Sequence, residues 1–279
     1  MMPTRTTRDG VVMPALIYGT AWKKESTSSL VAMAIRSGFR GIDTACQPKH
    51  YHEAGVGEAL SLLCNEGVDK EALFLQTKFT PLAGHDPLRI PYDPTAPLAT
   101  QVHDSFHVSQ RNLGRSCIDS YVLHSPLYPF RDLATVWKAM EEIFECGDVR
   151  QLGLSNCYDV EILERLAREK FHLPAVIQNR FYRETGYDKD IRAWCDDHGV
   201  LYQSFWSLTA NPHLLNSRPI IALAQAYGVE PPQIWYRFLT QKGLTPLIGS
   251  TSQEHMKADL AIFDFSLSDD EMVRIEDLL

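Results

Sequence analysis

Residues 133–156 read LATVWKAMEEIFECGDVRQLGLSN, and this stretch passes directly from a helix pattern to a strand pattern. Val136, Met140 and Ile143 recur at the spacing of three and four residues that places side chains on one face of a helix. Gly147 follows, and glycine is the residue type on which helices commonly end. The last eight residues form a short run typical of a buried strand. The stretch therefore predicts a helix that leads into a strand of a parallel sheet.

The same alternation recurs along the chain. Short strand-like runs lie at residues 14–20, 38–45, 73–79, 119–124, 149–156, 175–181, 200–206 and 244–250. Helical periodicity marks residues 28–36, 56–64, 102–113, 133–146, 160–170, 188–197 and 232–241. Eight such units predict an α/β fold, a (β/α)8 TIM barrel. A doubly wound open sheet is the alternative, but the sequence lacks the Gly-x-Gly-x-x-Gly turn that usually follows its first strand.

We expect residues 1–279 to form a single domain. Two of its segments do not follow the alternation of strands and helices. The dipeptide Asp9-Gly10 within residues 5–13 is a signal for a two-residue type I′ turn, so we expect a short β-hairpin that plugs the bottom of the barrel. Residues 80–99, after the third strand, contain five prolines. A loop of this length at the carboxyl ends of the strands is expected to form a lid or a wall of the pocket.

Composition excludes several classes of function. The net charge of −8 argues against a nucleic-acid or acidic-membrane partner, because both require a basic surface. Six scattered cysteines form no pair with metal-ligand spacing, so no metal is expected. The chain has no signal-peptide or membrane-spanning pattern. We expect a cytoplasmic monomer or weak homo-oligomer that acts on a small molecule.

Polar residues stand at the predicted carboxyl ends of the strands, where barrel enzymes carry their active sites. Strand by strand, these residues are Asp43, Lys78, His124, Ser155 with Asn156, Gln178 with Asn179, Trp206 with Ser207, and Gly249 with Ser250. Their joint placement, with Tyr51 on the loop after Asp43, predicts a site for proton transfer.

The chemistry can be built from four of these groups. A lysine ammonium close to a phenol stabilises the phenolate, so Lys78 is expected to lower the pKa of Tyr51 and make it a proton donor. Asp43 is expected to hold Lys78 charged and oriented, and His124 to hydrogen-bond the carbonyl oxygen of the substrate. This arrangement needs a hydride from a cofactor. Ser155, Asn156 and Gln178 offer polar groups for a carboxamide, and Trp206 offers a face for a flat heterocycle.

Several longer stretches resemble the aldo-keto reductase family nearly from end to end. They are GTAW (19–22), GIDTA (41–45), LQTKF (75–79), VLHSP (122–126), TVWKAMEEIFECGDVRQLGLSN (135–156), IQNRF (177–181) and FDFSLSDDEM (263–272). The resemblance implies a (β/α)8 barrel and NAD(P)H-dependent reduction of aldehydes and ketones.

The family's catalytic tetrad of Asp, Tyr, Lys and His matches Asp43, Tyr51, Lys78 and His124. The resemblance also implies nicotinamide contacts and first-loop contacts to cofactor and substrate. The matching positions are Ser155, Asn156 and Gln178 for the amide, Trp206 in place of a stacking tyrosine, and Thr20 with Trp22 in the first loop.

The chain departs from the family pattern in two motifs. Residues 43–53 read DTACQPKHYHE, so Tyr51 lies eight positions after Asp43 where the family usually has five, and the loop is expected to bulge near Pro48. Residues 248–259 read IGSTSQEHMKAD, in which Gly249 and His255 replace the two cations that hold an adenosine 2′-phosphate. Residues of this segment that could still contact the cofactor are Ser250, Thr251, Ser252, His255, Lys257 and Asp259. The resemblance to the family makes NADP(H) the first choice of cofactor, and the loss of these two cations makes NAD(H) the alternative.

Two other functions remain open. The pair His50 and His52 resembles part of a zinc site, as in a metal-dependent barrel hydrolase. A non-catalytic nicotinamide-binding subunit on the same fold is the other possibility, because a fold does not fix a function. The sequence ends at Leu279, soon after Phe265, so the resemblance implies an open pocket without the long C-terminal tail of many members.

Overall fold

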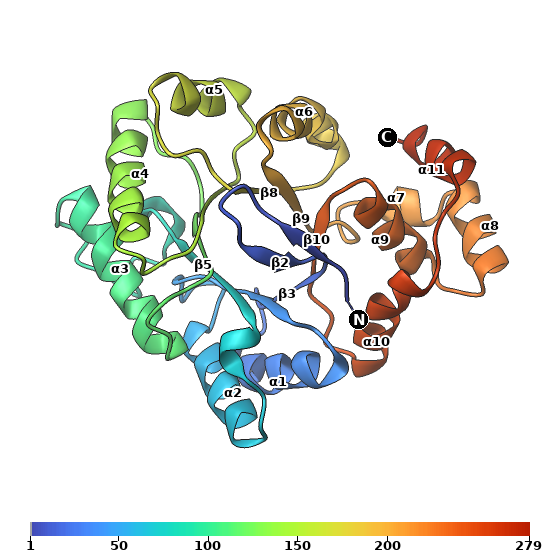
Figure 1. Cartoon of the computed structure of the whole chain (residues 1–279), viewed down its shortest axis with the longest axis horizontal. Coiled ribbons are helices and arrows are strands. Elements are labelled where there is room, and N and C mark those ends of the chain that lie inside the picture. The colour runs from blue at the N-terminus through green and yellow to red at the C-terminus, as the bar shows by residue number, and fades with distance from the viewer. Residues whose placement is uncertain (1) are drawn as a thin grey trace.

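Eight parallel strands close into a barrel in the computed structural model, which describes residues 2–279 (Figure 1). In chain order they are β3 (Ile17–Gly19), β4 (Gly41–Asp43), β5 (Phe74–Phe79), β6 (Ser120–Leu123), β7 (Leu152–Ser155), β8 (Val176–Arg180), β9 (Leu201–Phe205) and β10 (Thr245–Ile248). The last strand pairs with both β9 and β3, which closes the sheet. Each strand lies within one of the eight predicted runs, so the predicted (β/α)8 barrel is confirmed.

Helices surround the barrel in Figure 1. Those that the sequence predicted are α1 (Thr27–Ser37), α2 (Glu53–Asn65), α3 (Leu98–Leu113), α4 (Phe130–Glu145), α5 (Val160–Arg168), α6 (Lys189–His198) and α9 (Pro231–Gln241). Four were not predicted: α7 (Pro212–Leu215), α8 (Arg218–Tyr227), α10 (Gln253–Leu260) and α11 (Asp269–Glu276). Short 3-10 helices lie at Lys24–Ser26, Lys70–Ala72, Leu82–Gly84, Arg183–Asp188 and Ala261–Asp264. Within residues 2–279, no helix has the length and apolar character needed to cross a membrane.

The N-terminal hairpin is present, but its turn differs from the prediction. Strands β1 (Thr4–Thr6) and β2 (Val12–Pro14) pair in antiparallel fashion. The amide of Gly10 donates to the carbonyl of Thr7 at 2.9 Å, and Gly10 has a φ of 79° while Asp9 has no positive φ. A type I′ turn needs positive φ at both central residues, so the predicted turn type is wrong. The turn has three residues and closes on a left-handed glycine.

The hairpin closes the amino-terminal end of the barrel. Val11 and Met13 pack there against strand residues in a small hydrophobic cluster that is separate from the main core. The other members of this cluster are Ile17, Phe74, Val122 and Val176. Figure 1 shows β2 across the barrel axis. Ligands can therefore enter the barrel only from its opposite end, where the carboxyl ends of the strands lie.

A buried hydrogen-bond network fills the barrel interior above this plug. The side-chain amide of Gln76 donates to Asp43 at 2.7 Å and to Gln203 at 2.8 Å. That of Gln178 donates to the same two partners at 3.0 and 2.8 Å. Gln203 donates back to Gln76 at 3.0 Å, and Ser120 donates to Gln76 at 2.9 Å. Polar groups in a core cost little when they are paired in this way, and a satisfied network fixes the positions of its members.

The proline-rich loop runs from Thr80 to the start of α3. Tyr92 donates its hydroxyl to the carbonyl of Thr80 at 2.9 Å, and a ring nitrogen of His85 lies at the same distance from that carbonyl. These contacts hold the loop to its own first residue, directly after β5. Of the predicted pocket wall at residues 80–99, only Thr80 and Gly84 line the cavity described below.

Candidate active site

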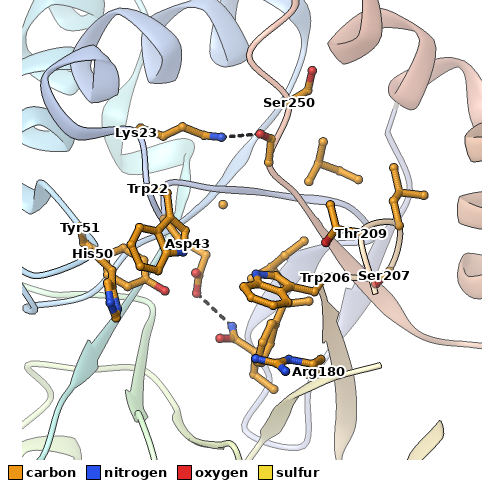
Figure 2. Close-up of a pocket in the computed structure, with 18 of the residues that line it drawn as sticks. Trp22, Lys23, Asp43, His50, Tyr51, Arg180, Trp206, Ser207, Thr209 and Ser250 are labelled. Atoms are coloured by element: carbon orange, nitrogen blue, oxygen red, sulfur yellow. Dashed lines mark hydrogen bonds between the residues drawn. The ribbon is translucent and has the colours of Figure 1, made fainter. Parts of the chain in front are cut away.

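A cavity of about 1130 Å³ opens at the carboxyl ends of the strands. Most of the site residues that the sequence predicted line it: Trp22, Asp43, Tyr51, His124, Ser155, Asn156, Gln178, Trp206, Ser207, Ser250, His255 and Asp259. Figure 2 shows several of them as sticks. The strands thus bring together residues that lie more than 200 positions apart in the chain.

An ion pair between Lys78 and Asp43 forms the floor of the cavity. The ammonium of Lys78 lies 2.7 and 2.6 Å from the two oxygens of Asp43 and donates to the carbonyl of Thr44 at 2.9 Å. Both side chains are buried. Burial lowers the pKa of Lys78, and the charge and hydrogen bond of Asp43 oppose this effect. The pair is therefore held in place from both sides, since the amides of the interior network also donate to Asp43.

The ring of Tyr51 lies against this pair, with its centre 5.2 Å from the ammonium of Lys78. Burial raises the pKa of Tyr51, and the negative charge of Asp43 adds to the rise. The expectation that the pKa of Tyr51 is lowered is therefore wrong. Burial and the charge of Asp43 raise this pKa by more than the ammonium of Lys78 can lower it.

The loop before Tyr51 absorbs its extra residues in a tight turn. The amides of His50 and Tyr51 both donate to the carbonyl of Gln47, at 3.2 and 3.0 Å. The side-chain amide of Gln47 donates to the carbonyl of Gly84 at 2.8 Å, and the carbonyl of His50 accepts from the amide of Trp22 at 2.7 Å. The long spacing between Asp43 and Tyr51 is thus compatible with a tyrosine at the cavity.

His124 completes the group, with its ring centre 5.9 Å from that of Tyr51. Its Nδ1 lies 2.7 Å from the hydroxyl of Thr80. Burial holds the pKa of His124 well below its usual value, and the positive charge of Lys78 lowers it further. The imidazole is therefore neutral at pH 7, with one N–H that the hydrogen bond of Thr80 can direct.

Ser155, Asn156 and Gln178 present polar atoms along one wall of the cavity. The amide nitrogen of Gln178 is used by Asp43 and Gln203, so its side-chain oxygen remains available to a ligand. Asn156 donates its amide to the carbonyl of His124 at 2.8 Å, and its oxygen accepts from the hydroxyl of Tyr158 at 3.4 Å, which leaves one further lone pair for a donor. A primary amide group is a matching ligand because it offers two N–H donors.

Two exposed indoles lie on either side of the cavity in Figure 2. Trp22 is 56% exposed and packs against His50, with ring centres 4.0 Å apart and ring planes tilted by 38°. Trp206 is 46% exposed. Both residues, and Asn156, have a positive φ, between 53° and 65°. Bulky residues adopt this backbone conformation only under strain, and such strain gathers at functional sites. Exposed aromatic faces of this kind suit a flat ligand that covers them.

Comparison with known proteins identifies the family of this chain. The model of the Aldo/keto reductase family matches residues 15–279. The chain belongs to the aldo/keto reductase family. It is therefore an NAD(P)H-dependent oxidoreductase on a TIM barrel. An uncharacterised oxidoreductase of Schizosaccharomyces pombe is 31% identical over 271 residues, which cover 96% of this chain and 88% of the relative.

Solved structures agree with this family membership. A crystal structure of an aldo/keto reductase from Brucella melitensis matches with a TM-score of 0.84 and 25% identity, and it covers the whole of both chains. A mutant of Gox0644 in complex with NADPH matches with a TM-score of 0.82 and 25% identity, over 100% of this chain and 94% of the other.

This aldo/keto reductase carries a cation that the sequence did not single out. Lys23 lines the cavity, and its ammonium donates to the carbonyl of Gly249. A Cβ atom added at Gly249 would lie 3.6 Å from that ammonium. Lys23 therefore places a positive charge beside the position where the family pattern has a lysine. Its place directly after Trp22 is the one signal in the sequence that could have indicated it.

Four residues that the sequence analysis assigned to the cofactor do not line the cavity: Thr20, Thr251, Ser252 and Lys257. Lys257 is an exposed residue of α10. Thr20 is fully buried, and its hydroxyl donates to the backbone carbonyl of Asp43 at 3.0 Å. Ser252 caps α10 by accepting from the amide of His255, and the side chain of Thr251 is exposed. Thr20 thus supports the strand end that carries Asp43, whereas Thr251 and Ser252 belong to the start of a helix.

The two histidines considered as a zinc pair, His50 and His52, have different neighbours. The ring of His50 packs against Trp22, whereas Nδ1 of His52 is buried without a hydrogen-bond partner among residues 2–279. No group of three or more His, Cys, Asp or Glu side chains among residues 2–279 has the arrangement to hold a metal ion. The two histidines therefore lack a further ligand in the part of the chain that the structure describes.

Asp259 gives the stability of this aldo/keto reductase a predicted pH dependence. Burial raises the pKa of its carboxyl group to about 7. In the unfolded chain the ordinary value is about 4, so the folded state binds this proton more tightly. The resulting stability is fully present below about pH 4 and is lost as the pH rises through 7.

We therefore expect Asp259→Asn to melt at a higher temperature than the wild type at pH 8 and to lose most of that advantage at pH 5. The expected change in the melting-temperature difference between the two pH values is about 3 °C or more for a chain of this size. The exposed Asp264, five residues further on, provides Asp264→Asn as a matched control without this dependence. A difference that is the same at pH 5 and pH 8 would refute the prediction.

Proposed function

We propose that this chain reduces the carbonyl group of an aldehyde or ketone to an alcohol, with Tyr51 as the proton donor and NADPH as the reductant. The observation that carries the proposal is the group of four side chains at one end of the barrel. The ammonium of Lys78 lies within 2.7 Å of Asp43 and 5.2 Å from the ring centre of Tyr51. His124 packs against the same ring. A phenol donor, an ion pair and a neutral imidazole thus lie together at the place where the substrate carbonyl is proposed to bind.

Tyr51 suits the role of a donor because its raised pKa keeps it protonated at neutral pH. When a carbonyl carbon accepts a hydride, its oxygen becomes an alkoxide, which is a stronger base than phenolate. Transfer of the phenolic proton is therefore favourable even from a weakly acidic tyrosine. The nearby ammonium of Lys78 stabilises the phenolate that remains.

His124 is proposed to orient the substrate. If the hydroxyl of Thr80 donates to Nδ1, the single proton of the neutral ring stays on Nε2, which can then donate to the carbonyl oxygen. Thr80 would then be a positioning residue that acts through His124.

Thr80→Val is expected to lower kcat/KM about three- to tenfold, because both tautomers of His124 become populated and hydrogen bonds of this kind contribute about 1 kcal/mol. Thr80→Ser keeps the hydroxyl and is expected to restore most of the activity. Steady-state kinetics of the two variants check this. A loss in the Ser variant with near-normal activity in the Val variant would show that the methyl group, and not the hydroxyl, matters.

The cavity fits a nicotinamide dinucleotide. The free oxygen of Gln178 and the remaining lone pair on the oxygen of Asn156 suit the carboxamide, and the exposed ring of Trp206 suits the flat pyridine ring. Ser155, Ser207, Ser250, His255 and Asp259 line the remainder together with Lys23. When bound, the cofactor supplies the hydride.

NADPH is the proposed form of the cofactor. The NADPH complex of the Gox0644 mutant described above supports this choice, as does the ammonium of Lys23. The carboxyl groups of Glu254 and Asp259 also line the cavity. Their negative charge disfavours the adenosine 2′-phosphate of NADPH, which makes NADH the alternative.

The test is the loss of reduced-nicotinamide absorbance with a panel of aldehydes and α-keto compounds, run in parallel with NADPH and NADH. We expect oxidation of NADPH with the higher kcat/KM. A higher value with NADH would overturn the cofactor assignment and leave the reaction standing. Tight binding of either cofactor without turnover across the panel would support a non-catalytic nicotinamide-binding subunit instead.

A further inference from the structure

Arg180 stands above the proposed nicotinamide site. It is the last residue of β8 and lies two residues beyond Gln178. Side chains two residues apart in a strand point to the same face and are separated by about 7 Å along the strand. Arg180 accordingly lines the cavity nearer its mouth, and it also borders an adjoining hollow of about 510 Å³.

The guanidinium of Arg180 lacks a polar partner within residues 2–279. Its central carbon lies 4.2 Å from the ring centre of Trp206 and 5.1 Å from that of Tyr182. Figure 2 shows it beside Trp206. Its Nε is buried without an acceptor, and it takes part in none of the ion pairs among these residues. A guanidinium that rests on aromatic faces keeps its N–H donors for a ligand.

No carboxyl group among residues 2–279 forms an ion pair with Arg180, so its charge is open to an anion. Lys49, within the tight turn before Tyr51, is a further cation among the residues that line the cavity. The carboxylate on the floor, that of Asp43, is neutralised by Lys78. The other carboxyl groups that line the cavity come from the segment around α9 and α10: Glu230, Glu254 and Asp259. Glu184 borders the adjoining hollow without forming an ion pair with Arg180.

We propose that Arg180 binds a carboxylate of the substrate, so that the preferred substrates are aldehydes or ketones with a carboxylate several bonds from the reacting carbonyl. This inference rests on the proposed function for the reaction itself. The planar fork of a guanidinium matches a carboxylate through two parallel hydrogen bonds. The height of Arg180 above Gln178 sets the spacing, because the carbonyl must reach Tyr51 and His124 while the carboxylate lies nearer the mouth.

The test compares 4-carboxybenzaldehyde with its methyl ester, which has nearly the same shape and no charge. The wild type is expected to prefer the acid in kcat/KM. Arg180→Met is expected to lower kcat/KM for the acid about tenfold or more, which is the effect of losing one charge-assisted pair of hydrogen bonds. The same substitution is expected to change kcat/KM for the ester less than about threefold. Arg180→Lys keeps the positive charge but not the planar guanidinium, and its kcat/KM for the acid is expected to lie between those of the wild type and Arg180→Met.

Arg183→Met is the matched control, because Arg183 carries the same charge three residues further on and is exposed away from the cavity. It should leave the preference for the acid unchanged. An equal loss in both Met variants would overturn the proposal in favour of a general attraction by the basic surface. An increased Kd for NADPH in Arg180→Met, with the acid-to-ester ratio unchanged, would overturn it in favour of a cofactor contact.

A binding measurement separates this inference from the proposed reaction. Calorimetric titration with 4-carboxybenzaldehyde needs no turnover, and binding that is lost in Arg180→Met supports the carboxylate site even if no cofactor is oxidised. If the ester is reduced and the acid binds equally well to the wild type and to Arg180→Met, the reaction stands and the carboxylate site is refuted.

Discussion

Tyr51→Phe is expected to reduce kcat for aldehyde reduction at least about a hundredfold, the scale of general acid catalysis, while the Kd of NADPH stays unchanged. The substitution removes one oxygen atom and keeps the ring that packs against His124 and lies near Lys78. The ion pair of Lys78 with Asp43 does not use this oxygen, so the fold should be unaffected. Steady-state kinetics give kcat, and quenching of tryptophan fluorescence gives the affinity for the cofactor.

Tyr128→Phe is a suitable control for this experiment. Tyr128 follows β6 on the same end of the barrel, is 71% exposed and does not line the cavity. Its loss of a hydroxyl should leave kcat unchanged. Near-normal turnover in Tyr51→Phe would remove Tyr51 from the mechanism and make His50, on the same loop, the first alternative donor.

Lys78→Met is expected to have two large effects. Turnover should fall about a hundredfold or more, because no cation then stabilises the phenolate of Tyr51. The free energy of unfolding should fall by about 3–5 kcal/mol, because Asp43 remains as a buried carboxylate without its counter-charge. Kinetics and urea denaturation measure the two effects separately.

The double variant Asp43→Asn with Lys78→Met separates stability from catalysis. It replaces both charges, so the penalty for an unpaired buried carboxylate disappears and most of the lost stability should return. Turnover should remain low, because the cation is still absent. Recovery of turnover together with stability would show that Lys78 has only a structural role.

The sequence predicts the barrel and the floor of the site well because both depend on local pattern. The alternation of strands and helices locates the strand ends, and the carboxyl ends of parallel strands in a closed barrel all meet on one face. Asp43 at the end of β4 and Lys78 in β5 are therefore placed together without any knowledge of side-chain geometry. Helix α11 could have been predicted in the same way, because Ser268 and Glu271 form a capping box.

Properties that depend on three-dimensional neighbours could not be predicted. The pKa of Tyr51 rises because the phenol is buried and lies near the negative charge of Asp43, and neither burial nor this neighbour is visible in the sequence. Lys23 reaches Gly249 across 226 positions, and Arg180 rests on the ring of Trp206, so both resemble ordinary surface cations in the sequence. The dipeptide Asp9-Gly10 fits more than one turn, and only the backbone shows which is adopted.

The glutamine network beneath Asp43 determines how the chain exchanges protons with water. The amides of Gln76, Gln178 and Gln203 hold hydrogen bonds without titrating at neutral pH, and the apolar plug of the hairpin lies below them. No proton wire can therefore run along the barrel axis. If Tyr51 is the proton donor, as proposed, each proton that it gives up has to be replaced from bulk solvent through the open end, along the path by which the product departs. We then expect reprotonation of Tyr51 to follow product release.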